Sequence, residues 1–215
     1  MKLWMGIAAG MGLALTLGGC ESVSKDQCLA GDWVSLGRAD GAVGRSSNRI
    51  EDIVKDCGRH GVTPDPQAYL AGWNEGVQIY CTPANGFNVG RQGSSHSGIC
   101  PPALAGSFEQ SYRLGYRLWS ARSAVEQVET RIRSLESRIA SDEAKLRQVD
   151  CARAKPEAQQ DCRNKAQDLR NAIQDSRFQL QDARWSLLQK QAEYQATEAA
   201  VHAEASVLIP GYGGQ

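Results

Sequence analysis

The C-terminal half of the chain repeats apolar residues at alternating intervals of three and four. Two such series occur, and each keeps the seven-residue period that is typical of a coiled-coil seam. Asp142 is the one polar member of the first series, while Ser176, Lys190 and Thr197 interrupt the second. The pattern therefore predicts two long amphipathic helices. The series are Leu114, Leu118, Ala121, Val125, Val128, Ile132, Leu135, Ile139, Asp142, Leu146 and Val149, and Ala166, Leu169, Ile173, Ser176, Leu180, Ala183, Leu187, Lys190, Tyr194, Thr197 and Val201.

A polar stretch that contains Pro156 separates the two series. Because a proline cannot continue a helix without losing a hydrogen bond and clashing one turn back, we expect the helices to fold into an antiparallel hairpin. Cys151 and Cys162 flank this break, and a disulfide between them would close a short loop, fix the register of the helices and contribute about 3 kcal/mol.

The predicted hairpin covers residues 107–206, with helices at about 107–149 and 161–206 and a turn at 150–161. Ser107 and Gln110 have the form of a capping box, which predicts the start of the first helix. Residues 207–215 are expected to form a flexible tail.

The second helix carries another apolar stripe away from the seam, formed by Phe178, Trp185 and Leu188. Large apolar side chains on the back of a two-helix coiled coil would face water unless something covers them. Either the N-terminal domain or the tail folds over the stripe, or the stripe contacts a second copy of the chain or an unknown envelope protein.

The N-terminal half differs in composition from the C-terminal half. It has 14 glycines from Gly31 to Gly115, whereas none occurs at 116–210. A phrase with an aromatic residue followed by glycine recurs as WVSLGRADG, AYLAGWNEG, FNVGRQG and YRLGYRL. Short helices are predicted near 27–38, 48–57 and 66–80, and an irregular loop at 81–105. The fold class is thus mainly α: a small Gly-rich, disulfide-stapled helical domain at 28–106, followed by the coiled-coil hairpin.

The chain begins with Lys2 and an apolar run that ends at Gly19, which is too short for a spanning helix and is typical of a signal peptide over 1–19. Leu17-Gly18-Gly19-Cys20 resembles the bacterial lipobox, and this resemblance implies that Cys20 carries fatty-acyl chains such as palmitate. Residues 20–27 would then be a lipidated linker. Glu21 stands where Asp usually retains such lipoproteins in the inner membrane, so we expect an anchor in the outer membrane of a Gram-negative cell, facing the periplasm.

Acylation of Cys20 leaves six of the seven cysteines, an even number that indicates three disulfides in an oxidising compartment. Besides the pair at the turn, Cys28, Cys57, Cys81 and Cys100 can pair in three ways, and closure between nearest neighbours, 28–57 and 81–100, is the favoured one. Without the leader the chain has 23 basic and 24 acidic residues and no basic patch, so a nucleic-acid partner is not expected.

Several segments carry a family resemblance. CLAGDWVSLGRADGAVG from Cys28, CGRHGVTPDPQAYLAGWNEGVQIYCTPANGFNVGRQG from Cys57, and SGICP followed by Phe108 and Tyr112 are similar to the bacterial envelope lipoproteins of domain-of-unknown-function family 2799. The resemblance extends over about 28–118 and supports the location and the build. It implies no activity.

Candidate chemistry is sparse. Cys57, His60, His96 and Cys100 have spacings that could form a zinc site, although two disulfides with surface histidines are the preferred interpretation. No nucleophile elbow, phosphate loop or metalloprotease motif occurs, so we expect neither an enzyme nor a cofactor. The leading hypothesis is a structural or interaction module that uses the hairpin. The alternative is a module that binds a glycan or small ligand through the 81–105 loop and the repeated aromatic residues Trp33, Tyr69, Trp73, Tyr80 and Phe87.

Overall fold

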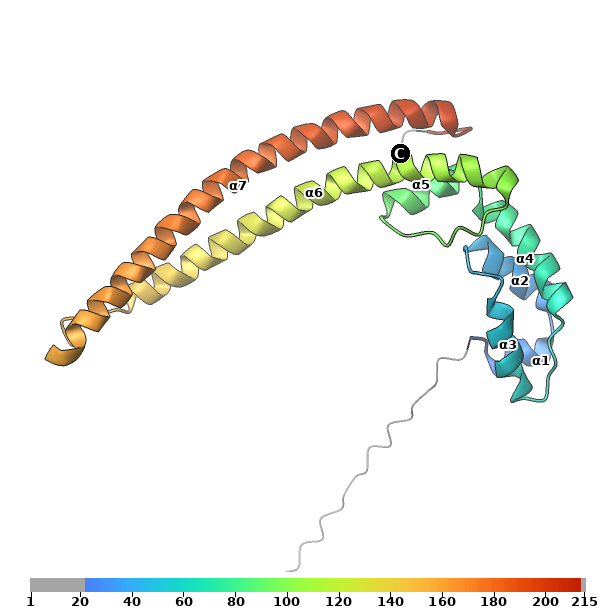
Figure 1. Cartoon of the computed structure of the whole chain (residues 1–215), viewed down its shortest axis with the longest axis horizontal. Coiled ribbons are helices and arrows are strands. Elements are labelled where there is room, and N and C mark those ends of the chain that lie inside the picture. Colours follow the sequence, from blue (N-terminus) through green and yellow to red (C-terminus); the bar gives the residue numbers. More distant parts are fainter. Residues whose placement is uncertain (1–21, 214–215) are drawn as a thin grey trace, which may run out of the picture.

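The computed structural model describes residues 22–213, and within this range the protein is mainly helical and has no β-strand (Figure 1). Five short helices gather at one end of the molecule, and two long helices lie side by side and extend away from them. The predicted signal peptide and the predicted acylation site Cys20 lie outside the described residues. The helices are α1 (Lys25–Ala30), α2 (Trp33–Ala42), α3 (Arg49–Gly58), α4 (Pro66–Tyr80), α5 (Pro83–Arg91), α6 (Pro102–Arg147), the 3-10 helix η1 (Pro156–Ala158) and α7 (Gln159–Leu208).

Local capping explains where most of the short helices begin. The Asp65 carboxylate accepts the backbone N–H groups of Gln67 and Ala68 ahead of α4, and Pro66 occupies its first turn. Thr82 and Pro83 play the same roles for α5. The irregular loop predicted at 81–105 is therefore wrong for 83–91, which is helical.

The predicted helix at 27–38 is divided in two. Gly31 adopts a left-handed conformation with a φ of 64°, which ends α1, and the Asp32 side chain then caps α2 by accepting the Ser35 N–H. α3 and α4 match their predicted ranges to within one residue.

α2 and α4 run parallel and touch through glycine. A Cβ atom on Gly37 would overlap the carbonyl oxygen of Tyr69, and a Cβ atom on Gly72 would overlap the carbonyl oxygen of Val34. Gly41 and Gly76 meet the opposite backbone in the same way one turn further on. Only glycine permits such a close approach of two helix backbones, which explains the paired glycines of the first two phrases.

α5 and the first part of α6 repeat this arrangement. Gly90 faces the carbonyl oxygen of Tyr112, and Gly115 faces that of Phe87. The cysteines repeat as well. Nine residues separate Cys28 from Gly37 and Cys81 from Gly90, and fifteen separate Cys57 from Gly72 and Cys100 from Gly115. We therefore call residues 28–80 the first unit and residues 81–119 the second unit; they are two versions of one disulfide-bonded pair of helices.

The six cysteines form three disulfides: Cys28–Cys57 in the first unit, Cys81–Cys100 in the second and Cys151–Cys162 beside the break between the long helices. These are the pairs of nearest neighbours along the sequence. Each unit is thus closed by its own covalent bond, which suits segments with little aliphatic core.

α6 and α7 run in opposite directions along each other. Three ion pairs show how the two helices are aligned: Arg117–Glu204 at 3.0 Å, Glu136–Arg184 at 3.0 Å and Glu143–Arg177 at 2.7 Å. As the residue number rises along α6, the number of its partner on α7 falls, as expected for antiparallel helices. The break falls around Pro156, as predicted.

The long helices are longer than predicted. α6 begins at Pro102, and Ser107 lies inside it, where its hydroxyl donates to the Leu104 carbonyl oxygen, so the predicted capping box is wrong. Pro101 and Pro102 supply the fixed φ of a first turn and start the helix earlier.

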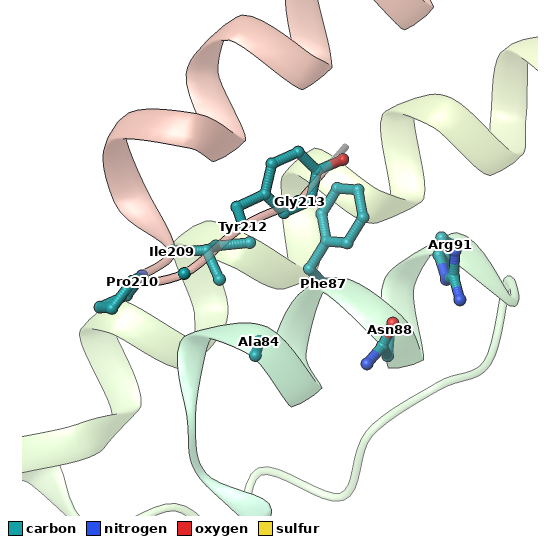
Figure 2. A pocket seen from close by; sticks show the side chains of 9 residues that line it. Ala84, Phe87, Asn88, Arg91, Ile209, Pro210, Tyr212 and Gly213 are labelled. Carbon is teal, nitrogen blue, oxygen red and sulfur yellow. The ribbon is translucent and has the colours of Figure 1, made fainter. Parts of the chain in front are cut away.

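The C-terminal segment packs against the second unit instead of forming a flexible tail over 207–213. Ile209 is buried in a cluster with Phe87 and Leu114, and the ring of Tyr212 meets the edge of Phe87 at 5.5 Å (Figure 2). The Tyr212 hydroxyl lies 2.6 Å from His202 Nδ1 on α7. These contacts bind the end of α7 to α5 and α6.

Candidate functional site

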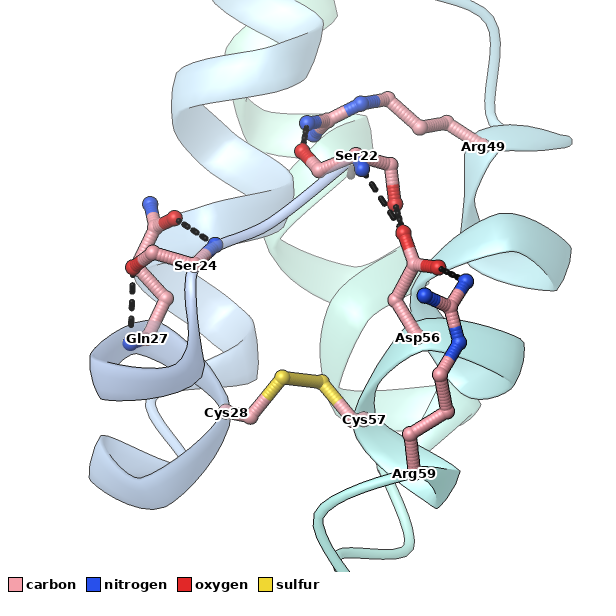
Figure 3. The surroundings of a disulfide bond; sticks show 8 residues. All are labelled: Ser22, Ser24, Gln27, Cys28, Arg49, Asp56, Cys57 and Arg59. Carbon is pink, nitrogen blue, oxygen red and sulfur yellow. Dashed lines mark hydrogen bonds and ion pairs between the residues drawn. A yellow bond between two sulfur atoms is a disulfide. The ribbon is translucent and has the colours of Figure 1, made fainter. Parts of the chain in front are cut away.

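The first described residue, Ser22, is bound to α3 by a cluster of polar side chains. We call Ser22, Arg49, Asp56 and Arg59 the clamp. The backbone N–H and the hydroxyl of Ser22 both donate to the Asp56 carboxylate at 2.7 Å, and Arg49 donates to the Ser22 carbonyl oxygen (Figure 3). The bonds from Ser22 hold the pKa of Asp56 below its usual value, and Arg59 also binds this carboxylate. Val23 is buried beside the Cys28–Cys57 disulfide. Residues 22–27, predicted as part of a linker, are therefore folded onto the first unit.

The clamp continues into the core of the first unit through Asp40, which is fully buried. Its carboxylate accepts from Tyr69 Oη at 2.9 Å, from Arg45 at 2.8 Å and from Arg49. Burial, and then the bond to Asp40, raise the pKa of Tyr69 well above its ordinary range. A buried carboxylate with this many donors is compensated, so Asp40 holds α2, α3 and α4 together instead of offering a free base.

The aromatic residues predicted to contact a ligand form the cores of the two units. Trp33, Tyr69, Tyr80 and Phe87 are all buried. Trp73 is partly buried and donates its indole N–H to the Arg45 carbonyl oxygen at 2.7 Å. Phe87 also lines a hollow beneath the C-terminal segment, so ligand contact through these residues stays a prediction. Their spacing reflects packing around the glycines.

The zinc alternative fails because its sulfur ligands are occupied. Cys57 is bonded to Cys28, and Cys100 to Cys81. His96 Nε2 lies 2.9 Å from Glu109, and its ring packs on Tyr112 at 4.4 Å. Within residues 22–213, no group of three or more potential ligands could hold a metal ion.

A cleft of about 490 Å³ lies where the end of α5 meets α6 and α7. Two guanidinium groups, Arg91 and Arg122, line it together with the rings of Trp119 and Tyr194. The Tyr194 hydroxyl donates to Glu198 at 2.6 Å, which fixes one wall. The cleft shares Arg91 with a neighbouring hollow of about 420 Å³ beneath the C-terminal segment (Figure 2). The cleft could not be predicted from the sequence, because its residues are up to 111 positions apart. The available signal was Trp119, which directly follows the fourth aromatic–glycine phrase.

The predicted stripe on α7 is open to solvent. Phe178, Trp185 and Leu188 expose 60%, 67% and 59% of their surfaces. They lie in the middle of α7, at least 20 residues before the buried Ile209 of the C-terminal segment that packs on the second unit. No part of the described chain covers them, so neither the N-terminal domain nor residues 207–213 act as the predicted cover.

These features define a class of protein: a double disulfide-bonded helical unit from which a long pair of helices extends. Residues 32–117 match the family described as "Protein of unknown function (DUF2799)". The match includes most of both units and ends where α6 leaves them. No curated protein and no solved structure matches the chain. Among residues 22–213, no helix combines the length and the apolar character needed to cross a membrane.

Proposed function

We propose that this protein is a lipid-anchored module of the Gram-negative envelope, held in the outer membrane through Cys20, and that its long helices form an antiparallel coiled coil on which another helix docks in the periplasm. The lipobox and the three disulfides support the location, because disulfides persist in oxidising compartments.

The burial pattern of α6 and α7 supports the coiled coil. Every residue of the two heptad series is buried or half-buried, while most residues between them are exposed. Asp142 and Ser176 place polar groups inside the seam, where polar residues commonly specify register. Charged pairs such as Glu136–Arg184 flank the seam, as e and g positions do in coiled coils.

The single observation that carries the docking function is the exposure of Phe178, Trp185 and Leu188. The outer face of α7 around them, over 171–199, holds glutamine, alanine and asparagine, and its charged members are Asp175 and Asp182. A second copy is the simplest occupant, because antiparallel alignment of two α7 helices sets Phe178 of each against Leu188 of the other. Such an isologous contact buries the same residues twice.

Sedimentation equilibrium of the purified protein tests this function. Phe178→Gln with Trp185→Gln should convert a dimer into a monomer, and Val207→Gln, which changes a more exposed apolar residue outside the stripe, should not. A wild-type protein that stays monomeric at every concentration would exclude the second copy as occupant and leave docking to another helix, which crosslinking at position 185 then tests.

A second candidate function is the binding of a small anionic ligand in the cleft between α5, α6 and α7. Arg91 and Arg122 supply guanidinium groups that favour carboxylates, and Trp119 supplies a ring face for stacking. Titration calorimetry with an acidic amino sugar and its neutral counterpart distinguishes this function. Binding of the acidic sugar that is lost in Arg122→Gln supports it, and equal heats for both sugars oppose it.

A further inference from the structure

We infer that the face of the first unit around Ser22 rests directly on the phosphate headgroups of the bilayer, with no linker between the lipid and the domain. This inference rests on the proposed acylation of Cys20 and goes beyond it, because it assigns a membrane-contacting surface to the folded part of the chain.

Ser22, the first described residue, is held firmly against α3. The N–H, the hydroxyl and the carbonyl oxygen of Ser22 are all hydrogen-bonded to α3. Cys20 precedes Ser22 by two residues, and two extended residues span at most about 7 Å. An acyl chain on Cys20 therefore brings the headgroup region to within this distance of Ser22.

The second step is the chemistry of the surroundings. Arg45 and Arg59 expose 56% and 53% of their side chains, whereas their partners Asp40 and Asp56 expose 1% and 9%. Arg49, which binds both Asp40 and Ser22, is partly exposed. The Asp40 and Asp56 carboxylates are thus turned inward and their arginine partners outward, while Asp52 is an exposed carboxylate on the same side of α3. Guanidinium groups bind phosphate oxygens bidentately and are the preferred phosphate ligands among cationic side chains.

The third step is the direction of this surface. Arg49, Asp52, Asp56 and Arg59 follow one another at helical intervals that place them on a single face of α3, and Ser22 lies over that face (Figure 3). α4 lies behind the disulfide in the same view. The membrane therefore lies on the α3 side of the first unit.

Photo-crosslinking to lipid tests the inference on the full-length native lipoprotein. A benzoylphenylalanine is introduced at position 52, on the clamp face, or at position 78, exposed on α4, and the protein is placed in nanodiscs of phosphatidylethanolamine and phosphatidylglycerol. Asp56→Ala removes the acceptor of both Ser22 donors. Glu51→Ala, on the same helix and without a side-chain bond to Ser22, is the matched control.

The expected result is a lipid adduct at position 52 and none at position 78, with the adduct retained in Glu51→Ala and mostly lost in Asp56→Ala. Equal adducts at both positions, or none at 52 in a protein that carries its acyl chains, would overturn the inference. The mass of the N-terminal peptide distinguishes failure of the membrane contact from failure of the proposed acylation, because a missing acyl mass refutes the lipid anchor itself. Circular dichroism of Asp56→Ala checks that loss of the adduct does not arise from unfolding.

Discussion

The first and second units share one framework and differ in what covers it. In both, parallel helices meet through glycine and a disulfide closes the unit. In the second unit, the outer face is buried beneath the end of α7 and the segment that follows it. In the first, the equivalent face is exposed to solvent. The equivalent residues are Phe87, Leu114 and Leu118 in the second unit and Val34, Ala71 and Glu75 in the first.

This difference shows that a few side chains determine whether the end of α7 can pack on a unit. Ala71 offers far less apolar surface than Leu114, and Glu75 pairs with Arg38 across the place where α7 would pack. Burying that ion pair would cost more than the small apolar gain returns. The first unit therefore stands without a cover.

The interiors differ as well. In the first unit the buried Asp40 accepts hydrogen bonds from two arginines and Tyr69, whereas the equivalent position in the second unit is Gly93. Tyr112, the counterpart of Tyr69, packs against His96 instead. The first unit thus has a polar interior and binds Ser22, whereas the second unit has an apolar outer face that is covered by Ile209.

The largest expected effect comes from the shared glycines. Gly72→Val and Gly115→Val each drive a side chain into the backbone of the facing helix, so each should cost more than about 4 kcal/mol of unfolding free energy. Thermal unfolding measures this loss. Gly106→Ala is the control in α6, where nothing lies within 4 Å of the new Cβ, and it should stabilise. A mild effect at either packed glycine would contradict the shared framework.

The next effect separates the two outer faces. Phe87→Ala removes a buried ring from the contact with Ile209 and Tyr212 and should cost roughly 4 kcal/mol, while Val34→Ala should change little because Val34 is exposed. Chemical denaturation of both variants gives the two values. Equal losses would mean that both faces are covered in solution.

The disulfides of the two units should contribute similar amounts. Replacing Cys28 and Cys57 by serine, or Cys81 and Cys100, should each cost about 3 kcal/mol, slightly more for the longer loop of the first unit. Unfolding of the two double variants, measured without reductant, tests the equivalence. A loss confined to one pair would show that the other loop is already ordered by packing.

The smallest effect is that of acid on the clamp. The bonds from Ser22 lower the pKa of Asp56 below 3.8, so the stabilisation they provide is complete above pH 3.8 and is lost as the pH falls through the lowered pKa. Hydrogen exchange of the Ser22 amide should therefore accelerate only in strong acid, while amides around Phe87 stay protected. Release of Ser22 near neutral pH would contradict the lowered pKa of Asp56.

Much of this fold could be predicted from local signals. The caps at Asp65-Pro66, the heptads and Pro156 gave α4 and the long helices to within a few residues, and the nearest-neighbour disulfides follow from short loops. α5 was missed because Gly86 and Gly90 resemble helix breakers, although in the structure they allow close contact with α6.

The clamp and the cleft could not be predicted, because both depend on long-range contacts. Ser22 and Asp56 are 34 residues apart, and no periodicity links them. The exposed stripe was predictable because one helix period suffices to place Phe178 and Trp185 on one face.

The proposed docking role of α7 is tested most directly by photo-crosslinking in living cells with a probe at position 185, in the centre of the stripe, compared with position 134 on the exposed side of α6. The account predicts a discrete protein adduct at 185 that disappears in Phe178→Gln and is absent at 134. No adduct at 185, or the same diffuse products at both positions, would contradict it.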